Sequence, residues 1–178
     1  MPTLVLDYVE SMPRPDYAQD PRWKYLRADE RARWQRIAHD FGAGERDIAA
    51  KRWTVARRIV GSLHRAGVPV LAGTDAPMPG VYPGYSLHDE LERLVDSGYS
   101  PAEALRAATL APAKFLRIEA DSGSVATGQR ADLVLLGANP LRDIGNARRI
   151  EAVVLDGRLL KRDALDALLA NAAREAGD

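Results

Sequence analysis

Only two short runs in the first 120 residues of this chain have the composition of a buried β-strand. They are residues 3–8 and 68–72, which are apolar and contain β-branched side chains. Residues 29–40 are polar and favour a helix, and residues 45–66 repeat apolar side chains at helical spacing up to Gly67, which ends that helix. This part of the chain is therefore predicted to be mainly helical, with two strands between the helices.

Two serines mark the starts of further helices. Ser86 and Ser100 each stand three residues before an acidic side chain, as in a capping box, and Pro101 takes the first helical position after Ser100. Helices are expected to start after both serines. Another helix, rich in alanine and leucine, is predicted over residues 163–175.

Strand-like sequence fills the stretch before that last helix. Residues 133–136 and 150–155 are predicted strands. Asp156-Gly157 has the sequence of a two-residue hairpin turn leading into residues 158–160. A separate β module is therefore expected near the C-terminus.

The overall composition excludes several classes of protein. The 178 residues carry 25 basic and 25 acidic side chains, so the formal net charge is zero. The charge therefore does not indicate nucleic acid or an anionic membrane surface as a partner. The chain has no cysteine, which excludes disulfides, thiolate metal ligands and a cysteine nucleophile. No apolar run approaches the roughly 18 residues of a membrane span, and the N-terminus lacks the pattern of a secretion signal. A cytoplasmic location is expected, and Arg148-Arg149 is predicted to be a solvated surface pair.

A single carboxylate, Asp75, closely follows the predicted strand at residues 68–72. Parallel α/β enzymes place their catalytic groups at the C-terminal ends of such strands, which makes Asp75 a candidate for chemistry. The alternative is that its side chain only caps the following turn. The glycine- and proline-rich loop at residues 77–84 comes next and would shape a pocket.

A series of short motifs runs from residue 67 to residue 133. In chain order they are Gly-Val-Pro-Val-Leu-Ala-Gly-Thr-Asp (67–75), Ser86-Leu87-His88-Asp89-Glu90-Leu91, Gly98-Tyr99-Ser100-Pro101-Ala102-Glu103-Ala104-Leu105, Ala108-Thr109, Pro112-Ala113, Gly123-Ser124-Val125 and Gly128-Gln129-Arg130-Ala131-Asp132-Leu133. Their order and spacing resemble the C-terminal part of a metal-dependent amidohydrolase, in the branch related to imidazolonepropionase and to the Xaa-Pro or arginine carboxypeptidases. The likeness covers roughly residues 55–160, and Pro2-Thr3-Leu4 also resembles a strand late in the barrel of that family.

The resemblance implies an α/β fold, in which a (β/α)8 or TIM barrel is joined to a small β-sandwich. This chain would then be a C-terminal fragment of such a hydrolase. Residues 1–120 would form the last βα units of the barrel, residues 121–161 part of a composite β-sandwich, and residues 162–178 a C-terminal helix. The aspartate that ends the eighth strand in this family binds the metal and acts as general base, so Asp75 is the expected catalytic residue and metal ligand.

The other metal ligands of the family have no counterpart in this sequence. The family uses a His-x-His pair on the first strand, a lysine or glutamate on the fourth, and single histidines on the fifth and sixth. A complete barrel takes about 250 residues, and only two barrel-type strands are predicted here. His39 is expected to be solvated, and His64 to favour its position near the C-terminal end of a helix through the helix dipole.

Four polar residues around the loop after Asp75 are candidates for binding substrate. Thr74, Tyr85, Ser86 and His88 lie in or next to that loop, although loop polar groups often satisfy only the backbone and His88 could equally have a surface or capping role. The pair Asp89-Glu90 resembles an acid–base pair, but acidic residues are favoured in the first turn of any helix.

Two hypotheses on function follow. In the first, the chain is part of a metal-dependent hydrolase of amide, cyclic amide or peptide-like carbon–nitrogen bonds. It would use Zn²⁺ or a similar divalent ion, one or two ions in the family, and would act on a small amide or dipeptide-like substrate. Its activity would need strands supplied by a missing N-terminal portion or by another copy in a homo-oligomer. In the alternative, the chain is an inactive fragment with a structural or self-association role.

Overall fold

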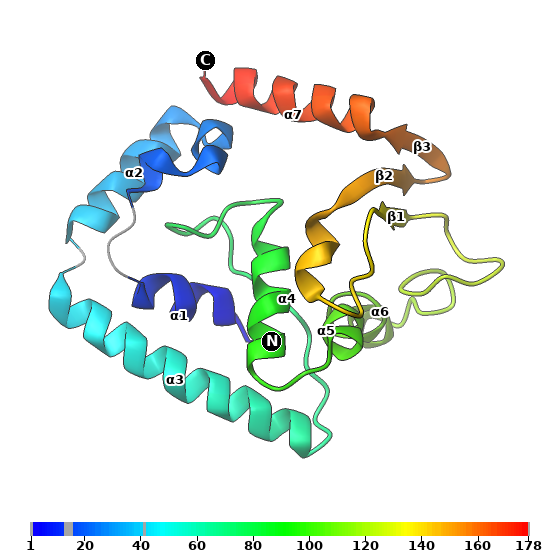
Figure 1. Ribbon diagram of the computed structural model, residues 1–178, viewed down its shortest axis with the longest axis horizontal. Coiled ribbons are helices and arrows are strands. Elements are labelled where there is room, and N and C mark those ends of the chain that lie inside the picture. The colour runs from blue at the N-terminus through cyan, green and yellow to red at the C-terminus, as the bar shows by residue number, and fades with distance from the viewer. Residues whose placement is uncertain (1, 13–15, 41, 178) are drawn as a thin grey trace.

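The computed structural model describes residues 2–12, 16–40 and 42–177 of the chain (Figure 1). Helices dominate the first two thirds, and a small sheet with one long helix follows them. None of the helices in these ranges is long and apolar enough to cross a bilayer. The elements are α1 (Leu4–Ser11), η1 (Tyr17–Gln19), η2 (Pro21–Tyr25), α2 (Ala28–Asp40), α3 (Ala43–Arg65), α4 (Ser86–Asp96), α5 (Pro101–Ala108), α6 (Leu110–Leu116), β1 (Leu133–Leu136), η3 (Ile144–Arg148), β2 (Ile150–Leu155), β3 (Arg158–Lys161) and α7 (Arg162–Gly177).

The main core lies where α1 packs between α3 and α4 (Figure 1). Leu4 of α1, Val60 of α3 and Leu94 of α4 are buried together there. Ile144 of η3 reaches the same cluster, which ties the C-terminal part of the chain to the helices. Burial of these side chains supplies the apolar contacts that hold segments far apart in sequence.

The strand prediction for residues 3–8 is wrong, because these residues enter the helix α1. No strand of the described chain lies beside them to complete a β-ladder, whereas a helix satisfies its backbone groups internally. The first turn also gains a partner from another helix, since the Val5 N–H donates to Oε2 of Glu90 at 2.7 Å. Leu4 and Val5 are then both fully buried.

The strand prediction for residues 68–72 is also wrong. The segment is not helical but belongs to no sheet, and in the described chain it meets no neighbouring strand. It contacts the core through the side chains of Val70, which is buried, and Ala72, and the Ala72 N–H donates to the carbonyl oxygen of Ala107 at 2.9 Å. The described residues therefore contain no parallel strand pair, and the expected barrel strands are not formed.

The predicted strands at residues 133–136, 150–155 and 158–160 and the hairpin turn between the last two are confirmed. Strands β1, β2 and β3 form an antiparallel sheet in that order. Asp156 and Gly157 join β2 to β3 with φ angles of 49° and 75°, the left-handed values that a tight hairpin turn requires. The helix α7 then runs from the end of β3 back to η2.

The predicted helices α2, α3 and α7 are all present, α3 beginning two residues earlier than expected. The capping box at Ser100 is confirmed, with its hydroxyl and the Glu103 carboxylate bonding each other's backbone N–H groups. The box at Ser86 is wrong: the residue before it is already helical, and Ser86 itself donates its N–H to the Tyr82 carbonyl at 3.0 Å.

A second core is aromatic and belongs to the segment around α2. Trp34 is fully buried and meets the ring of Tyr82 edge to face, with centroids 4.9 Å apart. Tyr17 and Trp23 contact Trp34 in the same way. Trp34 is the centre of this cluster, which fixes the loop that carries Tyr82.

Candidate functional site

Asp75 lies on the loop between the extended segment and α4, with its side chain exposed. Its φ of 55° is in the left-handed region, which non-glycine residues rarely adopt and which aspartate tolerates better than most. No hydrogen bond or ion pair joins its carboxylate to the described residues, so it does not act as the turn cap considered above. The carboxylate is therefore accessible to a ligand.

The loop that follows Asp75 is anchored to the core. Val81 and Tyr82 are buried, and the Val81 N–H donates to the Met78 carbonyl at 2.7 Å. The guanidinium of Arg22 lies 4.4 Å from the centre of the Tyr82 ring, in a cation–π contact. These contacts hold the C-terminal end of the loop in place, at Val81 and Tyr82.

Three of the four predicted substrate-binding residues gather at the start of α4. Tyr85 is half-buried, stacks on Tyr25 with centroids 5.6 Å apart, and has its pKa raised to about 12, chiefly by burial. His88 is half-buried, and burial together with Arg148 lowers its pKa, which favours the neutral ring. Both are neutral hydrogen-bonding groups near neutral pH.

Ser86 differs from these two in exposure, whereas Thr74 does not. Ser86 is only 2% exposed, so its hydroxyl does not reach solvent in this conformation. Thr74 is half-buried beside Asp75. The Nδ1 atom of His88 is also buried and meets no hydrogen-bond partner among the described residues. His88 therefore has an unused nitrogen that is buried, and Ser86 offers no accessible group either.

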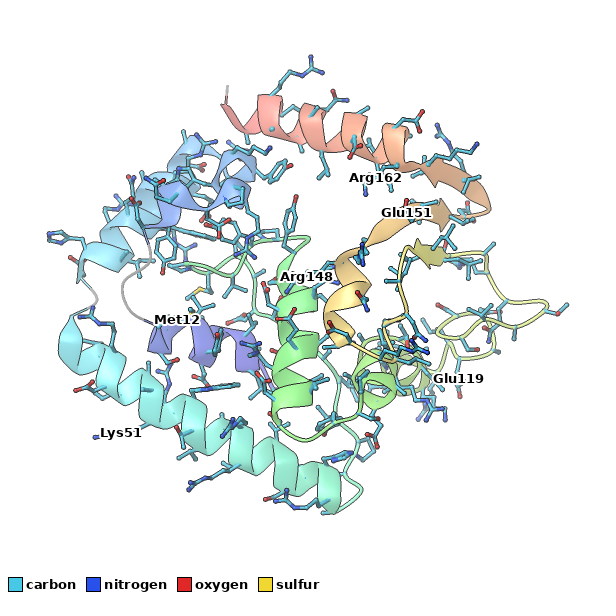
Figure 2. All side chains as sticks on the ribbon, viewed as in Figure 1. Met12, Lys51, Glu119, Arg148, Glu151 and Arg162 are labelled. Carbon is cyan, nitrogen blue, oxygen red and sulfur yellow. The ribbon has the colours of Figure 1, made fainter. Side chains whose placement is uncertain are left out.

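An ion-pair network at α4 was missed by the sequence analysis. Arg148 of η3 donates to Oδ1 of Asp89 at 2.6 Å and to Oε1 of Glu92 at 3.0 Å, and Figure 2 shows it beside α4. Arg22 donates to Oδ2 of the same Asp89 at 3.2 Å. Arg148 is exposed, as predicted for a solvated surface, but its charge is also paired across 59 residues, which the sequence did not indicate. This network fixes the turn of α4 that carries His88.

Glu90, the neighbour of Asp89, faces the opposite environment. It is fully buried beneath α1, where Oε2 accepts the Val5 N–H and Oε1 meets no partner among the described residues. Burial raises the pKa of this carboxyl to about 8, against the lowering effect of the N–H groups of Val5 and Leu4. Asp89 and Glu90 therefore do not form one acid–base pair.

Metal ligands do not gather on the described part of the chain. No three or more His, Asp or Glu side chains there lie close enough to hold one ion. Nε2 of His64 lies 3.0 Å from Oε1 of Glu103, and His39 is exposed beside Asp40, as expected for a solvated residue. A catalytic divalent metal usually has three protein ligands, so the described residues do not fit a complete metal site.

Comparison with known proteins gives a consistent family. The profile of the Amidohydrolase family matches residues 30–160. Adenine deaminase 2 of Rhizobium etli is 40% identical over 91 residues, which cover 51% of this chain and 14% of the deaminase. The structure of a bottromycin amidohydrolase superposes on 99% of this chain and 40% of its own, with a TM-score of 0.79 and 27% identity. A Xaa-Pro dipeptidase with bound methionine covers 65% of this chain and 28% of its own, with a TM-score of 0.56 and 30% identity. The chain thus spans well under half the length of each of these proteins.

Proposed function

We infer that this chain, which belongs to the amidohydrolase family, takes part in the hydrolysis of carbon–nitrogen bonds. The observation that carries the proposal is the exposed, unpaired carboxylate of Asp75, held in an uncommon backbone conformation inside the family's segment. Small amides, cyclic amides and dipeptide-like molecules are the proposed substrates, in line with the deaminase and dipeptidase relatives.

In this proposal the chain is one part of a catalytic unit. Residues 1–120 would complete a (β/α)8 barrel, residues 121–161 would form part of a β-sandwich, and residues 162–178 would close the chain as a helix. The strands of such a barrel, including residues 68–72, would form their ladders only when neighbouring strands from another copy or from further polypeptide are present.

Amidohydrolases generally depend on a divalent metal, and Zn²⁺ or a similar ion is proposed here. The described residues do not fit a complete site, so Asp75 would supply one ligand and the remaining ligands would come from outside them. Asp75 would also accept the proton of the attacking water, the usual task of a positioned carboxylate. Neutral Tyr85 and His88 would donate hydrogen bonds to the substrate together with Thr74, and Ser86 would join them only if the loop shifts.

A chimaera tests this role of Asp75. Residues 1–178 replace the superposable part of the bottromycin amidohydrolase, and amide hydrolysis and zinc content are measured with and without Asp75→Asn. Loss of a general base is expected to lower kcat by about 10²- to 10⁴-fold. The control is Asp121→Asn, an exposed aspartate on a loop, which is expected to leave the rate unchanged. Equal rates for Asp75→Asn and the parent chimaera would remove Asp75 from the mechanism. A folded but inactive parent chimaera would favour a structural role.

A further inference from the structure

The outward face of α3 carries an apolar stripe that no other described element covers. Ile48, Val55, Ile59 and Leu63 remain 59%, 53%, 53% and 37% exposed. Their spacing of seven, four and four residues places them on one side of the helix. Figure 1 shows α3 along the outer edge of the molecule, with α1 on its inner side. Apolar stripes of this kind on a surface helix commonly bind a partner.

A groove runs beside this stripe, where α1 meets α3. It has a volume of about 420 Å³. Arg52 forms its charged wall, but that charge is already neutralised, because Nε donates to Asp7 at 2.9 Å and Nη2 contacts Glu10. The lining residues are Asp7, Ile48, Lys51, Arg52, Val55, Ala56 and Ile59. Arg52 therefore adds no unpaired charge to the groove, whereas Lys51 is exposed and forms no ion pair with the described residues.

Charges beside the stripe show which occupant fits. The side chains of Asp47 and Arg58 are exposed and make no ion pair or hydrogen bond with the described residues. They stand eleven residues apart, about three helical turns, and so lie on the same flank of the stripe. Glu45 in the first turn and Arg65 in the last have the same order along the helix, acidic then basic, but they stand 20 residues apart and so lie on opposite sides of it. An identical helix in antiparallel orientation would place each acidic end against a basic end, whereas a parallel one would oppose like charges.

We propose that the α3 stripe binds a second copy of this chain, with the two α3 helices antiparallel about a two-fold axis. Ile48 then packs against Ile59 of the second copy, and Asp47 pairs with Arg58 of the second copy. The symmetry repeats each contact twice. The stripe is small compared with the roughly 800 Å² per partner of a standard interface, so the dimer is weak and depends on concentration. The inference does not rest on the proposed hydrolase function, because it uses none of the residues around Asp75.

Charge exchange between two single variants tests the proposal. The mass of the full chain is followed by analytical ultracentrifugation over about a hundredfold range of concentration, and a monomer–dimer equilibrium is expected for the wild type. Asp47→Arg and Arg58→Asp each create two like-charge contacts in the homodimer and are expected to weaken it about tenfold or more. An equimolar mixture of the two variants restores both opposite-charge contacts and is expected to dimerise like the wild type.

The control Arg106→Asp makes the same charge change on an exposed position of α5, and it is expected to dimerise normally. Circular dichroism of each variant checks that α3 is still folded. A wild type that stays monomeric over the whole range would overturn the proposal. So would single variants that dimerise normally, or a mixture that fails to recover, since either result would place the contact on another surface or in another orientation.

Discussion

The β module and the helical part of this chain are stabilised by contacts of very different range. Strand β3 pairs with β2 across the two-residue turn at Asp156-Gly157, and β1 pairs with β2 from only a short distance upstream. In the helical part, α1 depends on α3 and α4, and the Val5 N–H donates to Glu90 across 85 residues. Strands formed where the partner is close in sequence, and helices formed where no partner strand is available.

The comparison predicts that the helical part can be disrupted without loss of the sheet. Trp34→Ala removes the fully buried centre of the aromatic cluster, and we expect a loss of about 3–5 kcal/mol in the free energy of unfolding. Hydrogen exchange should accelerate in residues 16–40, while the amides that pair β2 with β3 keep their protection. The control Val125→Ala, at a side chain 85% exposed, should change stability by less than about 0.5 kcal/mol. Equal acceleration in both parts would mean that they unfold as one unit, contrary to the comparison.

The second test uses pH to act on the contact between α1 and α4. The pKa of Glu90 is raised from 4.5 to about 8 in the folded chain, so the folded state binds this proton more tightly than the unfolded state. Its contribution to stability is full below about pH 4.5 and is lost as the pH rises through about 8. Glu90→Gln stays neutral and should be more stable than the wild type at pH 9, by on the order of 5 kcal/mol, with little difference at pH 4.

Urea titrations of both proteins across this pH range measure that difference. Glu119→Gln, on the loop after α6 and exposed, is the matched control and should follow the wild type at every pH (Figure 2). If Glu90→Gln loses stability toward high pH as steeply as the wild type, then another group causes the dependence.

Local patterns in the sequence were sufficient for the elements whose contacts are local. The periodicity of residues 45–66 predicted α3, and Asp156-Gly157 predicted the hairpin, because each pattern determines its own hydrogen bonds. Short apolar runs such as residues 3–8 do not distinguish a strand from a buried helix. Their conformation depends on whether a neighbouring strand is present, which the run itself does not encode.

In the candidate site, too, local motifs predicted some features, whereas the features that depend on long-range contacts were missed. Asp75 and the start of α4 were located by motifs along the chain, and the structure places Tyr85 and His88 there. The bridge from Arg22 through Asp89 to Arg148 joins residues 67 and 59 positions apart, and no local signal marks it. The burial of Glu90 was equally hidden, because the first turn of a helix is an ordinary place for an acidic residue.

Two glycines with nearly the same backbone conformation, one in the helical part and one in the β module, allow the packing of the two parts to be compared at single positions. Gly80 has a φ of 81° and Gly157 a φ of 75°, so alanine at either position pays a similar backbone strain of about 1 kcal/mol. A Cβ atom at Gly157 would meet no heavy atom within 4 Å, whereas one at Gly80 would lie 2.4 Å from Cγ1 of Val9 in α1. Gly80→Ala should therefore cost about 1–2 kcal/mol more than Gly157→Ala, since the β-branched Val9 has little freedom to move aside. Unfolding of the two variants in urea measures the difference directly. An equal loss of stability in the two variants would show that the loop carrying Gly80 is not held against α1. The helical part would then depend on fewer long-range contacts than its comparison with the β module implies.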